Sequence, residues 1–248
     1  MTAALVLSRA TPLLILALAW EAAARSGLIS DYALPTLTSV AVTFVNLAAT
    51  DLYYHTARSI WRGTLAFAAA VPLGMAAGIL IAWFLPVRIL LKPILQCLYP
   101  MPKSALIPLT IIWIGIGDSS KIALIFLGCL VPIVMSAFNG ARGVDQTLLW
   151  TARSLGASER QVLWEIVVPG ALPEIMNGIR TALALSFILM VAAELIIAND
   201  GIGYLINLLG EAGEYSGMFA GVITISAIGF AADRGCVALT RWLLAWRE

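Results

Sequence analysis

Residue types that carry most enzyme chemistry are sparse in this sequence of 248 residues. It holds one histidine, His55, and three cysteines, Cys97, Cys129 and Cys236, which are scattered through apolar stretches. The cysteine spacing matches no metal-ligand or redox pattern, so we interpret these residues as small hydrophobes packed between helices. A Ser-His-acid set would have to recruit His55, and there is no glycine-rich phosphate loop of the Walker type. The sequence therefore predicts a protein that is not an enzyme and has no cofactor, metal or ATP site.

Two ionisable residues stand inside apolar stretches, where a charge is costly and often functional. Glu194 either belongs to a translocation pathway or gate, or is the structural partner of another span. Lys103 follows Pro102 in a proline-rich apolar stretch. In a pathway for anions its charge would lower the electrostatic barrier; the alternative is that it lies at the cytoplasmic end of a short span and reaches the headgroups. Pro102, Lys103 and Glu194 are therefore candidates for a translocation pathway.

The composition indicates that lipid, not water, surrounds most of these residues. The chain is 61% hydrophobic and 12% charged, and its net charge is +1. Soluble domains carry about 25% charged residues, which keep their surface wetted. The balanced charge gives no indication of nucleic-acid binding. We predict an all-α membrane bundle, one domain over residues 1–248 with about six spans.

Six apolar stretches account for the predicted spans. The first, 11–24, is short and contains Glu21, and could instead be a signal peptide. The third, 93–117, contains four prolines; irregular backbone is tolerated in lipid only beside protein or a wet cavity. This stretch is therefore predicted to form a wall of the pathway. The other four are nearly free of charge and long enough to cross the bilayer: 63–87, 122–141, 175–198 and 215–232, the last continuing towards residue 240.

Gly74 and Gly78 in the second predicted span have the spacing that lets two helix backbones approach closely. Close helix packing is therefore predicted here. The sequence does not say whether the neighbouring helix belongs to the same chain.

The distribution of basic residues favours an orientation with both termini in the cytoplasm. Arg58 and Arg62 count against it, unless they lie on an outer amphipathic segment or near the end of the second span. In this orientation the inner regions carry Arg9, Arg88, Lys92, Arg142, Arg153, Arg160, Arg241 and Arg247, and the outer regions carry Arg25, Arg58, Arg62 and Lys121.

The one long polar stretch, residues 142–174, lies on the predicted cytoplasmic side and is predicted to form two short helices. Asp145 can cap the first helix. Gly156 can end it, because glycine readily adopts the left-handed conformation of a helix stop. Ser158 can cap the second helix. Two prolines are predicted to stop that helix before the next span: Pro169 and Pro173.

Each short helix has an apolar face that needs a partner. A groove on a soluble protein would satisfy this need, and so would packing against the ends of the chain's own spans. The residues by themselves favour neither alternative. The two faces consist of Leu148, Leu149, Ala152 and Leu155, and of Val162, Leu163, Ile166 and Val167.

Residues 150–158, WTARSLGAS, and 166–173, IVVPGALP, closely resemble the EAA loop of the membrane subunits of binding-protein-dependent ABC importers. Gly156 has the same offset as the glycine of that loop. The family's leading glutamate and first alanine are here Trp150 and Thr151, which argues against a salt bridge from the first position. The resemblance implies that the loop docks onto an ATPase through Ala152, Arg153, Ser154, Leu155, Gly156, Ala157, Ser158, Pro169, Leu172 and Pro173.

Four further stretches resemble the nitrate, sulfonate and taurine permease group, so that the resemblance covers roughly residues 31–241. They are YPMPKSALIP (99–108), IWIGIGDSSK (112–121), AAELI (192–196) and GIGYLI (201–206).

The resemblance implies a type I ABC importer permease of a bacterial inner membrane. Its expected partners are a second copy of the chain, two ATPase subunits that hydrolyse ATP, and a periplasmic or lipid-anchored binding protein. Its expected cargo is a small anion such as a sulfonate, taurine or nitrate; aromatic acids or vitamin precursors are the alternative. An autonomous channel or ion-driven carrier, or a membrane scaffold that transports nothing, remain alternatives from other classes.

Overall fold

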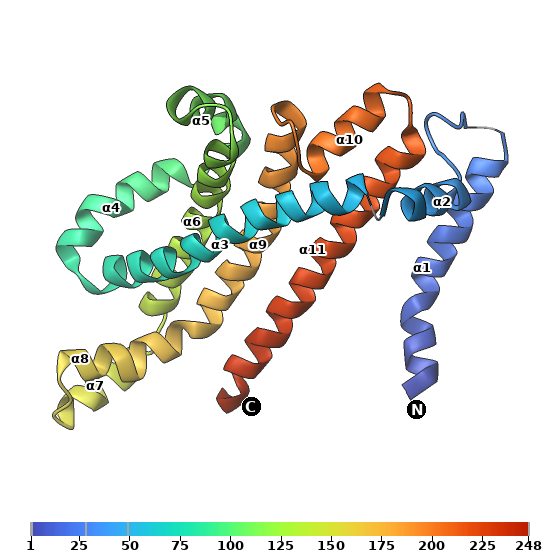
Figure 1. Cartoon of the computed structure of the whole chain (residues 1–248). Helices are drawn as coiled ribbons and strands as arrows, with labels where there is room; N and C mark the ends of the chain where they lie inside the picture. The colour runs from blue at the N-terminus through green and yellow to red at the C-terminus, as the bar shows by residue number, and fades with distance from the viewer. Residues whose placement is uncertain (1, 28, 49, 248) are drawn as a thin grey trace. The chain divides into compact units, whose positions relative to one another are not determined.

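The computed structural model describes residues 2–27, 29–48 and 50–247, without the side chains of 2–10, 13 and 247. The predicted inner-face residues Arg9 and Arg247 lie outside the described side chains. All regular elements in the described part are helices (Figure 1). The predicted all-α class is therefore confirmed.

Four helical segments of the described part are long and apolar enough to cross a membrane, and a bent pair of helices is a fifth candidate. A further helix, α1 (Thr2–Arg25), has 24 residues, the length that a span needs. The four segments are α3 (Asp51–Trp83), α6 (Asp118–Arg142), Glu159–Ile196 and α11 (Tyr215–Leu243).

Helix α3 differs at both ends from the predicted span 63–87. It starts at Asp51, because isolated charged residues interrupt an apolar run without ending a helix. It ends at Trp83, because Phe84 is extended with φ −97° and ψ 116°. Pro86 lies in the first turn of the next helix, α4 (Leu85–Leu98), where its missing N–H is not needed.

The proline-rich stretch forms the bent pair. Helix α4 is followed by the short η1 (Lys103–Leu106) and α5 (Ile107–Ile114), and the two arms meet at 96°. The ammonium group of Lys103 donates to the carbonyl oxygens of Leu98, Tyr99 and Met101 at 2.6, 3.1 and 2.7 Å. The lysine thus satisfies carbonyls at the end of the broken helix; that of Leu98 also accepts from the Met101 N–H at 3.3 Å. The predicted irregular backbone is confirmed.

By contacts between Cα atoms the chain divides into two units. Unit 1 comprises Met1–Arg58 and Asn199–Ala227, and unit 2 comprises Ser59–Ala198 and Ile228–Glu248. Unit 1 contains α1, α2 (Leu37–Ala48), α10 (Ile202–Glu211) and parts of α3 and α11.

In unit 1, the junction of α1 and α2 is fixed by Glu21. Its carboxylate accepts from the Leu37 N–H at 2.8 Å and from the Thr38 hydroxyl at 2.5 Å. A carboxylate at this position satisfies a free N–H at the start of α2 and is favoured by the helix dipole. The charge that made the first predicted span doubtful therefore joins two helices.

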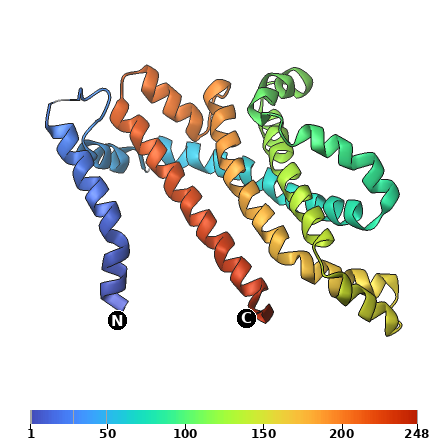
Figure 2. The same cartoon turned by 180° about the vertical axis from the view of Figure 1, so that it is seen from behind.

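In unit 2, α6 and α9 (Val168–Ile196) lie side by side in both views, and their facing sides form the core (Figures 1 and 2). The short helices α7 (Gln146–Ser154) and α8 (Glu159–Gln161) lie at one end of this pair, and α5 lies at the other (Figure 1). Since α7 and α8 connect the end of α6 to the start of α9, the two long helices are antiparallel.

Helix α3 approaches α6 most closely at Gly74 and Gly78. A Cβ atom on Gly78 would lie 2.5 Å from the Val134 carbonyl oxygen and 2.5 Å from the Ala137 Cβ. Both contacts are shorter than van der Waals distance, so only glycine fits. The predicted close packing is confirmed, and its partner is a helix of the same chain.

We expect Gly78→Ala to destabilise the chain by about 1–3 kcal/mol, because the new methyl group forces α3 away from α6. Thermal unfolding in detergent micelles measures the effect. Gly229→Ala is the matched control, because its Cβ would meet Phe187 at an ordinary 3.8 Å. The control should be neutral or slightly stabilised, because alanine favours helices. Equal losses in both variants would contradict the close approach.

Candidate functional site

The polar loop 142–174 forms a sharp elbow between α7 and α8. The Asp145 side chain caps α7 by accepting from the Thr147 N–H at 2.8 Å. Ser158 caps α8, and its own N–H donates to the Gln161 side chain at 2.9 Å, which completes a capping box. Both predicted caps are confirmed.

Gly156 makes the turn between the two helices. Its φ is +85°, in the left-handed region where residues with a Cβ are strained. The Gly156 N–H donates to the Arg153 carbonyl and the Ala157 N–H to the Ala152 carbonyl, both at 3.0 Å. This is the bond pattern of a Schellman motif, so the predicted helix stop at Gly156 is confirmed.

An ion pair spans the elbow. Arg153 of α7 donates from Nε and Nη2 to the carboxylate of Glu159 of α8, at 2.8 and 3.0 Å. The hydrogen bond to Glu159 raises the pKa of Arg153 above its ordinary value. Because this exposed pair is bidentate, its main effect is geometric: it holds the two short helices at one angle.

The apolar residues of the elbow divide into an inward and an outward set. Leu149, Val162 and Val167 are buried, as expected if the loop packs against its own chain. Leu155 remains 83% exposed, and Ser154 beside it is exposed too. Packing against the chain's own spans therefore covers only part of the two apolar faces. The outward set, which we call the elbow tip, consists of Leu148, Trp150, Leu155 and Trp164.

The prediction that Pro169 and Pro173 stop the second helix is wrong. The helical path is continuous over Glu159–Ile196, through a π-helical turn η2 (Val162–Val167) and into α9. A proline ring clashes with the carbonyl four residues before it. For Pro169 this carbonyl belongs to Glu165, which lies in the wider π-helical turn. Leu172 and Pro173, both half-buried, lie in the first turns of α9.

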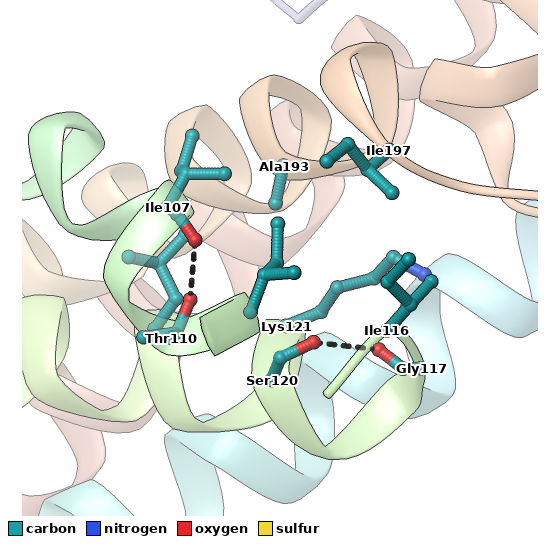
Figure 3. Close-up of a pocket in the computed structure, with 10 residues that line it drawn as sticks. Ile107, Thr110, Ile116, Gly117, Ser120, Lys121, Ala193 and Ile197 are labelled. Atoms are coloured by element: carbon teal, nitrogen blue, oxygen red, sulfur yellow. Dashed lines mark hydrogen bonds between the residues drawn. The ribbon is translucent and has the colours of Figure 1, made fainter. Parts of the chain in front are cut away.

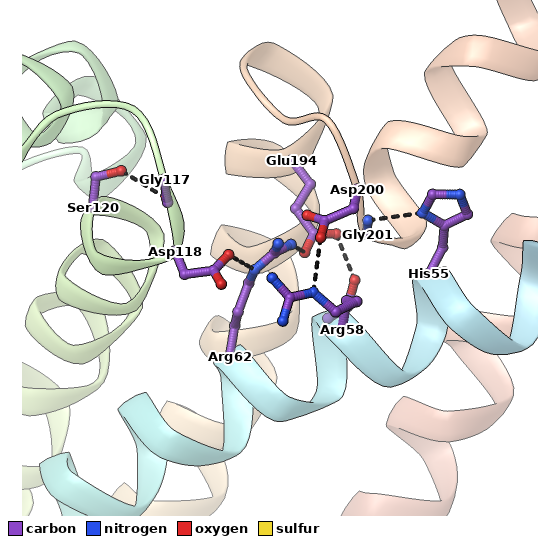
Figure 4. A network of polar contacts seen from close by, with 10 residues as sticks. His55, Arg58, Arg62, Gly117, Asp118, Ser120, Glu194, Asp200 and Gly201 are labelled. Carbon is purple, nitrogen blue, oxygen red and sulfur yellow. Dashed lines mark hydrogen bonds and ion pairs between the residues drawn. The ribbon is translucent and has the colours of Figure 1, made fainter.

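A second candidate site lies at the opposite end of unit 2, where α6 begins and α9 ends. Arg62 of α3 donates from Nη1 to Glu194 at 2.7 Å and from Nε to Asp118 at 2.6 Å (Figure 4). The Ser59 hydroxyl donates to the other Glu194 oxygen at 2.6 Å. Arg62 and Glu194 are each only 1% exposed. This buried network joins three helices and gives Glu194 the geometry of a structural partner.

Sequence reasoning missed Arg62 as the partner of Glu194, because it treated that arginine as a flanking charge. The available signal was that an acid at membrane depth needs a cation.

In unit 1, Arg58 pairs with Asp200 at 2.7 Å, and His55 Nδ1 accepts from the Gly201 N–H at 3.1 Å. Both arginines that counted against the predicted orientation are therefore compensated by carboxylates.

A small pocket beside this end of unit 2 lies between α5, the start of α6 and the end of α9 (Figure 3). Its wall includes Thr110, Ser120 and Lys121. The two hydroxyls are bonded to backbone carbonyls, of Ile107 at 2.9 Å and of Gly117 at 3.0 Å. Lys121 is buried, and its nitrogen points away from Thr110. Most polar groups of this pocket are thus engaged in contacts within the protein.

A larger cavity, of about 430 Å³, lies between the break after α4 and the helices α6 and α9. Lys103 contributes to its wall, and the exposed Pro102 directly precedes it in the chain. The Lys103 ammonium is bonded to three carbonyls, so its charge is only partly available to a solute. Glu194 does not line this cavity. The structure thus places Lys103 on the cavity wall, with Pro102 next to it in the chain, and places Glu194 elsewhere.

Comparison with known proteins identifies the family. Residues 70–244 match the family described as binding-protein-dependent transport system inner membrane component. The taurine transport system permease protein TauC of Escherichia coli (strain K12) is 39% identical over 240 residues, which cover 94% of this chain and 87% of the relative. The putative aliphatic sulfonates transport permease protein SsuC of Bacillus subtilis (strain 168) is 36% identical, with 96% and 86% covered.

Among solved structures, an inward-facing conformation of the MetNI methionine ABC transporter is similar in fold. Its TM-score is 0.62 at 17% identity, and the match covers 75% of this chain and 93% of that one. The curated relatives are permease subunits, not enzymes. This chain belongs to the inner membrane components of binding-protein-dependent transport systems, and it is a permease subunit of an ABC importer.

Proposed function

We propose that this permease imports a small anionic solute of the sulfonate or taurine type. A substrate-binding protein delivers the solute, and two separate ATPase subunits drive its passage. The observation that carries the proposal is the exposed elbow tip at one end of α6 and α9, on a chain whose relatives are taurine and aliphatic sulfonate permeases. Large apolar side chains held outward on a rigid elbow suit a groove on a soluble partner.

In this proposal the coupling loop, residues 142–174, has a docking part and a transmitting part. Leu155 and Ser154 contact the ATPase, while Gly156 and the pair of Arg153 with Glu159 hold the elbow in shape. Movement of the docked elbow passes into α9 because the helical path is unbroken. The other loop residues for which the resemblance implied docking stabilise the elbow or its junction with α9: Ala152, Ala157, Ser158, Pro169, Leu172 and Pro173.

The pathway candidates receive different roles. Lys103 belongs to the wall of the 430 Å³ cavity, whose size suits a small solute, and the exposed Pro102 precedes it at the break after α4. Glu194 holds the far end of α9 against α3 through Arg62, so it supports the pathway wall without contacting the solute. Residues 1–248 form a single transmembrane domain in this proposal.

The proposed setting is a bacterial inner membrane, with the elbow and both termini in the cytoplasm. The larger number of basic residues on the inner flanks supports this orientation, and Arg58 and Arg62 on the outer side are each paired with a carboxylate. A second copy of the chain completes the pathway around a two-fold axis. Closure of the ATPase pair then switches the cavity between inward-facing and outward-facing states.

Flux measurements in proteoliposomes test the proposal. We expect uptake of radiolabelled taurine only when the permease, the ATPase subunits, the loaded binding protein and ATP are all present. The permease alone should give no flux above empty vesicles, because it has no energy source of its own. Competition by an alkanesulfonate, nitrate and benzoate ranks the cargo classes.

Each alternative has its own outcome in the same experiment. Uptake by the permease alone would show a channel or ion-driven carrier. Binding of the ATPase without flux of any of these solutes would show a scaffold. Flux of benzoate without flux of taurine would keep the importer and replace the cargo class.

A further inference from the structure

An ion pair joins α9 to α11 within unit 2, inside two segments that are long and apolar enough to cross a membrane. Arg180 donates from Nε and Nη2 to the two carboxylate oxygens of Asp233, at 2.6 and 2.9 Å. Arg180 lies near the middle of α9, between the α7–α8 end and Glu194. Its side chain is 51% exposed, whereas that of Arg62 is 1% exposed. Arg180 is therefore unlike the buried cation of the α3–α9 network.

An exposed guanidinium at this depth is poorly suited to acyl chains. Charged residues in spans generally face a water-filled cavity or other protein groups, because hydrocarbon solvates them badly. Asp233 accepts only some of the hydrogen bonds that Arg180 can donate. A guanidinium has five N–H donors, and the bonds to Asp233 use one on Nε and one on Nη2. The Nη1 edge remains able to bind an anion.

The neighbours of Arg180 on α9 indicate what surrounds it. Asn177, Thr181, Ala184 and Ile188 are all exposed and recur at helical spacing, so they form one face; Arg180 lies at the edge of this face, one turn from Asn177 and Ala184. This face changes from polar to small to apolar away from the α7–α8 end. Thr181 and Ile188 also line the 430 Å³ cavity that contains Lys103. The exposed face of α9 is therefore continuous with the wall proposed for the pathway.

We propose that Arg180 binds the anionic group of the cargo in the inner half of the pathway, and that Asp233 is the positioning residue that orients its guanidinium. Planar guanidinium matches the oxygens of a sulfonate through parallel hydrogen bonds. The bidentate bond to Asp233 fixes the arginine and moderates its charge, so that an anion is attracted without being trapped. The cargo class in this inference rests on the proposed function.

Thiol labelling at Ala184 tests the site without transport. Ala184 is exposed and one helical turn from Arg180. Ala184→Cys is placed in a chain carrying Cys97→Ser, Cys129→Ala and Cys236→Ser, in nanodiscs with and without ATPase subunits. The probes are the anionic 2-sulfonatoethyl methanethiosulfonate and its cationic trimethylammonium analogue, with rates normalised to a free thiol. We expect the sulfonate to react about 10-fold faster than the cation, and Arg180→Gln to bring this ratio near one.

Two controls separate the Arg180 contact from general charge. Arg234→Gln removes a neighbouring cation, which lies over the Phe230 ring and 3.9 Å from the Asp233 carboxylate; it should keep most of the preference, because Arg180 remains. Ile188→Cys, one turn farther from Arg180, should show a weaker preference. Size-exclusion profiles of Arg180→Gln establish that the labelled protein is folded.

Three outcomes would overturn the inference. If the thiol introduced by Ala184→Cys reacts with N-ethylmaleimide but with neither charged reagent, this face contacts lipid. If that thiol reacts with none of the three reagents, the face is covered by another subunit. If both charged reagents react equally and Arg180→Gln changes nothing, no anion contact exists. Because labelling needs neither cargo flux nor ATP hydrolysis, its failure is distinct from failure of the importer assignment.

Discussion

Glu194→Ala is expected to destabilise the chain by about 3–5 kcal/mol, the cost of leaving a buried charge without its partner. The change removes the carboxylate that accepts from Arg62 and Ser59, while Arg62 stays 1% exposed. Asp118 still accepts from Arg62, but it is partly exposed and on another helix. The loss is measured as the shift of the unfolding midpoint in an SDS titration from mixed micelles. Glu174→Ala, at an exposed carboxylate of α9, should be close to wild type.

A double substitution distinguishes pairing from packing. Arg62→Met with Glu194→Leu removes both charges and keeps apolar volume, so it should recover most of the stability lost in Glu194→Ala. If the double variant is as unstable as the single one, the network contributes through shape and not through charge. If Glu194→Ala matches Glu174→Ala, the buried pair does not stabilise the fold.

Gly156→Val is expected to abolish most ATP-driven uptake while leaving the spans folded. A Cβ at φ +85° costs about 1–2 kcal/mol locally, and more for a branched side chain. The elbow can escape this strain only by changing the angle between α7 and α8, which moves the elbow tip. Space is not the obstacle, since no atom lies within 4 Å of the new Cβ. Co-purification of the ATPase and uptake of taurine should therefore fall together.

Gly156→Asn is the matched control at the same position. Asparagine adopts the left-handed conformation more readily than valine, so it should keep more uptake and more bound ATPase. The thermal stability of both variants should stay close to that of the wild type, because the elbow lies outside the spans. Normal uptake and normal ATPase binding in Gly156→Val would contradict the coupling role.

Local signals in the sequence were sufficient to predict the elbow and the all-α class. Asp145, Gly156 and Ser158 were placed correctly because a cap or a helix stop depends on groups within one turn of the chain. Four of the predicted spans coincide with helices that are long and apolar enough to cross a membrane, because crossing lipid requires a minimum apolar length. The prediction that the helix ends at Pro169 was wrong for an equally local reason. A π-helical turn accommodates the clash of the proline ring, which usually ends a helix.

The sequence by itself determined that this chain spans a membrane as helices and forms a capped elbow, because those properties follow from composition and short-range hydrogen bonding. Only the tertiary structure decided which groups meet. Arg62 and Glu194 are 132 residues apart, and nothing within one turn of either residue specifies the other. The same is true of Arg180 with Asp233, and of the choice that buries Leu149 but exposes Leu148. These pairings depend on which helices are neighbours, and the packing of whole faces settles that.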